Sequence, residues 1–173
     1  MAKENKISHI ALIIVTFMLI NLIITFEMSI VMPLARAISS YYAVSPQSVS
    51  LLNIGYAISG FVSPFFGYLA DKKGVKKMVV ASIIIFTLGS FIVATGSKQA
   101  YIIGRLILGV GYYNLGSFGF TYSKLTLDEK MQGISSGLYK VAFALGAFLS
   151  PLMGAKMIEV MNFSTIYLYL GIA

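Results

Sequence analysis

The stretch that decides the fold is Gly67-Tyr68-Leu69-Ala70-Asp71-Lys72-Lys73-Gly74-Val75-Lys76-Lys77, a short basic segment between two long apolar runs. Gly74 can adopt the positive φ that a tight chain reversal needs, because it has no Cβ. Asp71, at the edge of the apolar run, can meet a helix N-terminus or a cation. The segment is also typical of a plain inter-helix loop, since Lys and Arg are retained on the cytoplasmic side of membranes.

The composition places these apolar runs in a membrane. Of the 173 residues, 58% are hydrophobic and 11% are charged, and the mean hydropathy is +0.86. Soluble domains carry about 45–50% apolar and about 25% charged residues. The 13 Lys and Arg and 6 Asp and Glu are too few to cover a water-exposed surface, so we predict an apolar outer surface in contact with lipid.

Several kinds of chemistry are excluded by what the chain lacks. It has no Cys, its only histidine is His9, and it contains no Walker loop, dinucleotide fingerprint or H-E-x-x-H motif. Residues 133–137 fit G-x-S-x-G, but no strand precedes them and no histidine is near enough to act as a base. We therefore predict that the chain is not an enzyme and holds no cofactor or metal, which leaves an ion gradient as the energy source.

The apolar runs predict a series of membrane-spanning helices. A span needs about 20 residues, and the first run is too long for a cleaved signal peptide. The last run is shorter than a full span, so the sequence is expected to end inside a helix, as a fragment or a natural half of a larger protein. The predicted spans cover about 7–37, 48–70, 78–95, 101–122, 133–158 and, in part, 163–173.

The charge of +7 follows the loops between these spans. Because the lysines lie in the gaps and form no basic face on a soluble body, they indicate membrane orientation, and no nucleic-acid partner is predicted. A multi-pass protein of the cell membrane with a cytoplasmic N-terminus places the richest segments inside, namely Lys3 and Lys6, the four lysines of 71–77, and Lys124 and Lys130.

Three motifs carry a family resemblance. Segment 67–77 resembles the signature G-x-L-a-D-+-x-G-+-+ between the second and third helices of the major facilitator superfamily, and it matches at nearly every specified position. Residues 104–111 contain Arg105 and Gly109, similar to the family's R-x-x-x-G element in the fourth helix. The fifth span is similar to the antiporter motif G-x8-G-x3-G-P-x2-G-G, with small residues, Ser150 and Ala155, at two glycine positions.

This resemblance covers the whole chain and implies a fold and a mechanism. The fold is an all-α membrane protein, the N-terminal six-helix bundle of a major facilitator protein, with the sixth helix incomplete and the C-terminal bundle absent. The mechanism is alternating access, in which two bundles rock about a central cavity. The resemblance implies a conformational switch at Gly67, Asp71, Lys72, Gly74 and Lys76, and an exporter's tightly packed helix at Gly137, Gly146, Ser150, Pro151 and Gly154.

Two charges inside predicted spans are candidates for proton coupling, because intramembrane charges are rare and costly. Glu27 can carry a proton or pair with a cationic substrate, or else lie in the outer interface. For Arg105, the resemblance implies a cavity residue that helps proton release; the alternative is an arginine reaching the outer headgroups. Both lie toward the outer half of their helices, so they can pair with each other.

The remaining polar residues of the spans are candidates for the substrate cavity. Lys140 would suit an anionic group in the cavity, or could extend back to the cytoplasmic surface. The uncharged candidates can line a cavity or join helices by hydrogen bonds; they are Asn21, Asn53, Tyr56 and Asn114.

These observations favour a proton-coupled secondary transporter, an exporter or antiporter of amphipathic drugs or of a lipid-like or sugar-like metabolite. Its expected partners are the small-molecule substrate, protons, membrane lipids and a second six-helix half, on the same polypeptide or another copy. The alternatives are a non-transporting half that acts as a membrane scaffold or regulatory subunit, and a half that pairs with itself.

Overall fold

A computed structural model describes the backbone of residues 2–173 and the side chains from Ser8 onward. The described part of the chain contains helices and no strand, so the protein is all-α. The elements are α1 (Ala2–Tyr41), α2 (Pro46–Leu52), α3 (Ile54–Ile58), the 3-10 helix η1 (Ser59–Val62), α4 (Ser63–Lys73), α5 (Val75–Ala94), α6 (Lys98–Thr126), α7 (Glu129–Val160) and α8 (Phe163–Ile172).

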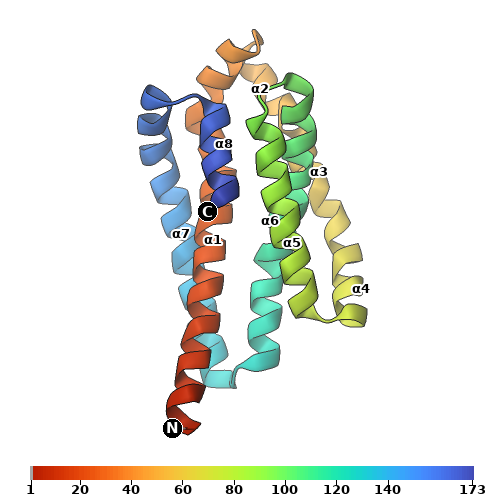
Figure 1. Cartoon of the computed structure of the whole chain (residues 1–173), viewed down its shortest axis with the longest axis vertical. Helices are drawn as coiled ribbons and strands as arrows, with labels where there is room; N and C mark the ends of the chain where they lie inside the picture. Colours follow the sequence, from red (N-terminus) through yellow and green to blue (C-terminus); the bar gives the residue numbers. More distant parts are fainter. Residues whose placement is uncertain (1) are drawn as a thin grey trace.

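Four helical stretches of the described residues are long and apolar enough to cross a membrane: Ser8–Tyr41, Pro46–Lys73, Val75–Ala94 and Glu129–Val160. Helix α6, at 29 residues, also extends along the bundle (Figure 1), but glycine, tyrosine and asparagine interrupt its apolar character. Helix α8 is a shorter apolar helix. The architecture is that of an all-α, multi-pass membrane protein.

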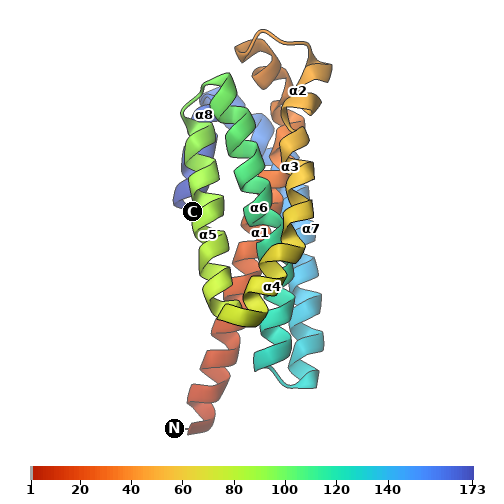
Figure 2. The ribbon, with the colours of Figure 1, turned by 90° about the vertical axis from the view of Figure 1, so that its right-hand side faces the viewer.

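Successive membrane-length segments run in opposite directions along one elongated bundle, so α1, α5 and α7 are parallel to one another. Figures 1 and 2 show the N-terminus, the α4–α5 connection and the α6–α7 connection at one end, with the α1–α2, α5–α6 and α7–α8 connections at the other. The most extensive pairings are α5 with α6 and α1 with α7. The three segments predicted to be cytoplasmic therefore lie at the same end of the molecule.

The stretch predicted as one span over 48–70 is divided into four short pieces, α2, α3, η1 and α4. At Asn53 the side-chain amide donates to the Val49 carbonyl at 2.7 Å, which competes with regular helical bonding. Pro64 lies in the first turn of α4, where its missing N–H removes no hydrogen bond within that helix. The segment Pro46–Lys73 thus crosses the bundle as one helical stretch with irregular hydrogen bonding at its internal boundaries.

The α4–α5 connection turns on a single residue. Gly74 has φ of +90°, and its N–H donates to the Ala70 carbonyl at 2.8 Å. A side chain at this position would be strained, because L residues rarely adopt such a φ. The reversal explains how α4 can be followed directly by α5.

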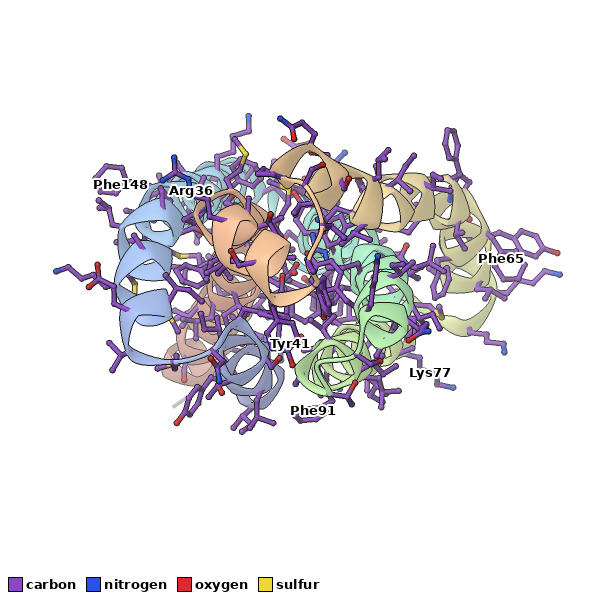
Figure 3. The ribbon with its side chains drawn as sticks, turned by 90° about the horizontal axis from the view of Figure 1, so that it is seen from above. Arg36, Tyr41, Phe65, Lys77, Phe91 and Phe148 are labelled. Carbon is purple, nitrogen blue, oxygen red and sulfur yellow. The ribbon has the colours of Figure 1, made fainter. Side chains whose placement is uncertain are left out.

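The surface of the bundle is apolar, as the composition requires. Phe61 and Met32 are 87% and 84% exposed. Viewed from above, Phe65 on α4 and Phe148 on α7 point outward on opposite sides of an oblong cross-section (Figure 3). Such side chains suit contact with lipid or with another membrane-embedded protein surface.

Candidate functional site

The centre of the site is a buried ion pair between Glu27 of α1 and Arg105 of α6, in which an Arg105 Nη1 hydrogen bonds to Glu27 Oε1. The two side chains are 0% and 3% exposed. Removing either partner would leave an uncompensated charge in a low-dielectric interior, which is strongly unfavourable. The pairing anticipated from the sequence is therefore present, and it lies inside the bundle.

Two tyrosines complete the coordination of this pair. The Tyr56 hydroxyl donates to Glu27 Oε2 at 3.0 Å, and the Arg105 Nη1 also donates to the Tyr167 hydroxyl at 3.3 Å. The Tyr56 ring lies against the guanidinium, with Cζ 4.1 Å from the ring centroid, a cation–π arrangement. Helices α1, α3, α6 and α8 thus all contribute to one buried polar cluster.

Asn53, at the joint between α2 and α3, orients the arginine. Its Oδ1 accepts from Arg105 Nε at 2.6 Å and from the Tyr101 hydroxyl at 3.0 Å. The amide thereby fixes the plane of the guanidinium relative to Glu27.

Glycines on α6 let the neighbouring backbones approach the cluster. A Cβ atom on Gly109 would lie 2.6 Å from the Tyr56 carbonyl oxygen and 3.0 Å from its Cα, so α3 rests directly on α6 there. A Cβ on Gly104 would lie 2.9 Å from the Val93 nitrogen of α5. Close helix contact of this kind is how small residues pack helices in lipid.

An aromatic cluster covers the end of the bundle beyond the ion pair. Tyr41, Tyr42, Tyr101 and Phe163 form ring contacts with centroid distances of 4.9–6.1 Å. Burial, reinforced by the neighbouring tyrosines, raises the pKa of the Tyr42 hydroxyl, which stays protonated and donates to the Ser97 carbonyl at 3.3 Å.

A pocket of about 280 Å³ lies on the other side, between α1, α6 and α7. Its lining is aromatic and hydroxyl-bearing, without a charged side chain: Asn21, Ile24, Thr25, Tyr112, Tyr113, Gly116, Ser117, Phe120 and Phe143. The Thr25 hydroxyl is fully buried and has no hydrogen-bond partner among the described residues. The pocket is therefore a candidate for binding a small organic molecule.

The structure divides the predicted cavity residues. Asn53 and Tyr56 belong to the ion-pair cluster, and Asn21 lines the pocket while donating to the Phe17 carbonyl at 2.8 Å. Asn114 is buried next to the Ser63 hydroxyl, which donates to its Oδ1 at 3.3 Å. Lys140 is exposed on α7 and does not line this pocket.

The helix with the antiporter-like motif packs on α1 through a seam of small residues. Cβ atoms on Gly146 and Gly154 would lie 2.6 Å from the Leu22 carbonyl oxygen and 2.9 Å from Ile30 Cγ1. Between them, the buried Ser150 hydroxyl donates to the Phe26 carbonyl at 3.0 Å, so serine keeps the close contact and satisfies its own polar atom. The other two predicted residues lie off the seam: Pro151 is exposed, and a Cβ on Gly137 would have no neighbour within 4 Å among the described residues.

The residues of the predicted switch lie together on the α4–α5 hairpin. Asp71, Lys72, Gly74 and Lys76 are exposed, and Lys72 Nζ lies 4.4 Å from the Tyr68 ring centroid. A Cβ on Gly67 would contact nothing within 4 Å among the described residues. This hairpin thus presents its charges outward. In the described part of the chain, no group of three or more histidine or acidic side chains lies close enough together to hold a metal ion.

Comparison with known proteins assigns the arrangement to a family. Residues 17–173 match the Major Facilitator Superfamily. The chain belongs to the major facilitator superfamily. Membership agrees with the bundle of helices long and apolar enough to span a membrane.

Three relatives of this major facilitator chain share 29% identity with it. They are azole resistance protein 1 of Saccharomyces cerevisiae, over 64% of this chain, an MFS-type transporter of Bacillus subtilis, YfiU, over 70%, and a protein of Salmonella paratyphi B named for multidrug resistance, MdtD, over 72%. The matched regions are 19%, 24% and 27% of those proteins. The chain thus spans about a fifth to a quarter of their length.

The sequence reading did not include three tyrosines of the site. They are Tyr101, Tyr112 and Tyr167. Each is partly or fully buried and lies beside the ion pair or in the pocket wall. The available signal was spacing: Tyr101 lies four residues before Arg105, on the same face of α6.

Proposed function

We propose that this chain is the first bundle of a proton-coupled secondary transporter that exports amphipathic drugs by alternating access. The observation that carries the proposal is the buried pair of Glu27 and Arg105, because a carboxylate and a guanidinium inside a membrane bundle are costly without a function. Family membership supports transport, and the buried carboxylate supports proton coupling.

Glu27 can link a proton to a change of shape. When Glu27 is ionised, its charge balances that of Arg105, and Tyr56 donates to it. When Glu27 takes up a proton, the permanently charged guanidinium loses its counter-charge while still buried. The bundle must then supply water or another acceptor to Arg105, which favours a rearranged state over the closed one.

The substrate class follows from the pocket beside the pair. Its walls of tyrosine and phenylalanine offer flat apolar surfaces with hydroxyl groups at their edges. Two relatives are named for resistance to azoles and to multiple drugs, which agrees with an amphipathic aromatic substrate. A second six-helix half, on the same polypeptide or another copy, would complete the cavity wall.

The orientation proposed is that of a cell-membrane protein with a cytoplasmic N-terminus. The lysine-rich α4–α5 hairpin and the α6–α7 connection share the end of the bundle that holds the N-terminus (Figure 2). Retention of positive charge on the cytoplasmic side supports this direction. Asp71 on that hairpin would then latch the cytoplasmic side against the second half.

The test is drug-driven proton movement in proteoliposomes that contain the chain in the full length its gene encodes. We expect ethidium or fluconazole added on one side to drive proton flux in the wild type and not in Glu27→Gln. Glu159→Gln, which alters an exposed glutamate at the end of α7, is the matched control and should couple like the wild type. Unchanged coupling in Glu27→Gln would overturn the proposed role of Glu27.

A further inference from the structure

We propose that Tyr112 transmits occupancy of the pocket to the Glu27–Arg105 pair through the ring of Tyr56, and that the occupant is a neutral aromatic heterocycle. The inference rests on the proposed function and deepens it, because it names the residue that couples substrate to proton and the class of substrate that the pocket takes. Tyr112 is a positioning residue, since it touches the ligand site and acts on Glu27 only through Tyr56.

Tyr112 lies between the two sites. It lines the pocket, and its ring contacts the Tyr56 ring with a centroid distance of 5.5 Å and an interplanar angle of 46°. Tyr113 supports both rings, at 5.1 Å from Tyr112 and 6.3 Å from Tyr56. The hydroxyl of Tyr56, beyond these ring contacts, donates to Glu27.

Tyr56 can respond only through its side chain. Its carbonyl accepts a hydrogen bond from the Ser59 hydroxyl, and its backbone rests on Gly109 of α6. One face of its ring is held by the Arg105 guanidinium. A ligand that moves Tyr112 therefore turns the Tyr56 ring, which changes both the hydrogen bond to Glu27 and the contact with Arg105.

The pocket favours a neutral aromatic ligand. None of its lining residues is charged, so a charged ring would lose hydration without gaining a counter-ion there. Four aromatic side chains offer stacking surfaces, and the tyrosine hydroxyl groups of the lining can hydrogen bond to a ring nitrogen. A triazole or imidazole with attached aromatic rings has these features.

Coupling of this kind is reciprocal, so it can be measured by binding alone. If a ligand changes the proton affinity of Glu27 by some factor, the proton changes the ligand affinity by the same factor. We expect a factor in the usual range of about 5–150. The readout is the dissociation constant of fluconazole as a function of pH, measured calorimetrically on the purified full chain in detergent micelles.

Other groups near Glu27 must be considered in that measurement. Those that face it are Arg105, Tyr56, Tyr101 and Tyr167, none of which changes charge near neutral pH in an unperturbed protein. The only histidine, His9, does not line the pocket. We would therefore carry out the measurements in a His9→Gln background and compare each one with Glu27→Gln, which isolates the part of the pH dependence that belongs to Glu27.

Three variants test the path. Tyr112→Ala should bind fluconazole more weakly, and the factor by which protonation of Glu27 changes the fluconazole dissociation constant should fall to about 1. Tyr112→Phe should keep the factor, because the contact with Tyr56 is made by the ring. Phe120→Ala, which removes another pocket wall without a ring contact to Tyr56, should weaken binding and keep the factor.

The outcomes separate this inference from the proposed function. If Glu27→Gln abolishes the pH dependence but Tyr112→Ala retains it, Tyr112 is not the path and only this inference is overturned. If the wild type binds fluconazole with no dependence on Glu27, the proposed proton coupling fails as well. Tighter binding of cationic ethidium than of fluconazole would overturn the assigned ligand class, and absence of fluconazole binding would overturn the pocket itself.

Discussion

The contact between α5 and α6 leads to a sharp prediction for Gly111→Ala. A Cβ atom at Gly111 would lie 2.7 Å from Phe86 Cβ and 2.9 Å from the Phe86 Cα and nitrogen. Ordinary carbon contacts are about 3.5–4.0 Å, so the helices must separate by about 1 Å. Because backbone atoms of α5 are in the way, rotation of a side chain cannot relieve the overlap.

The cost follows from the loss of packing along the whole pairing. Overpacking of a tight contact destabilises proteins by about 1–3 kcal/mol, and a clash with backbone belongs in the upper part of that range. Replacing glycine by alanine returns up to about 1 kcal/mol of helix propensity. We therefore expect Gly111→Ala to lower the free energy of unfolding by about 1–2 kcal/mol in total. The measurement is unfolding in mixed micelles of increasing dodecyl sulfate content, followed by circular dichroism.

Gly116→Ala, on the same helix, is the matched control. Its Cβ would meet no atom within 4 Å among the described residues, so only the propensity gain applies. It should be as stable as the wild type or slightly more so. If Gly111→Ala and Gly116→Ala unfold at the same denaturant fraction, the close approach of α5 to α6 described above is wrong.

Three further predictions concern stability in the same unfolding assay. Arg105→Ala should lower the free energy of unfolding by about 3–5 kcal/mol, because Glu27 is left buried and unpaired. Adding Glu27→Gln should recover part of that loss, and strictly additive effects of the two changes would contradict the ion pair. Gly74→Ala should lower the free energy of unfolding by about 1–3 kcal/mol, because alanine is strained at the positive φ of Gly74. Gly67→Ala, with open space around it, should leave stability unchanged, and equal losses in the two variants would exclude backbone strain. The Asp128 Oδ1 caps α7 by accepting from the Met131 N–H at 3.0 Å, so Asp128→Ala should lower the free energy of unfolding by about 1 kcal/mol. Asp128→Asn should restore most of that stability, and no loss in the alanine variant would argue against the cap.

Membrane character and family could be predicted from the sequence because they depend on strong local signals. Runs of apolar residues, lysines at their ends and the motif around Gly74 each reflect a physical need of a membrane bundle. The second span was predicted as one apolar helix, and the structure has a helical stretch there, Pro46–Lys73, that is divided into α2, α3, η1 and α4. Asn53 lies between α2 and α3 and Pro64 lies in the first turn of α4, but an isolated asparagine or proline in a span does not by itself predict such divisions.

The candidate site was predicted in part. Glu27 and Arg105 stood out as charges within apolar runs, and their positions along the helices suggested that they could meet. Their tyrosine partners could not be predicted, because a tyrosine in a membrane helix is as typical of an interface as of a core. Which helix faces which, and therefore that Tyr167 and Tyr56 flank the same guanidinium, depends on packing between distant segments.

The jointed second span has a mechanical consequence. At its joint the backbone remains bonded, since the Asn53 N–H still donates to the Val49 carbonyl and the Tyr56 N–H donates to that of Asn53. The span can therefore flex there without exposing unpaired amides to lipid. At one end of this span α4 is joined to α5 through Gly74, and at the other end α2 follows α1. The guanidinium of Arg105 is hydrogen bonded to Asn53, so a change in its charge balance would act directly on the boundary between α2 and α3.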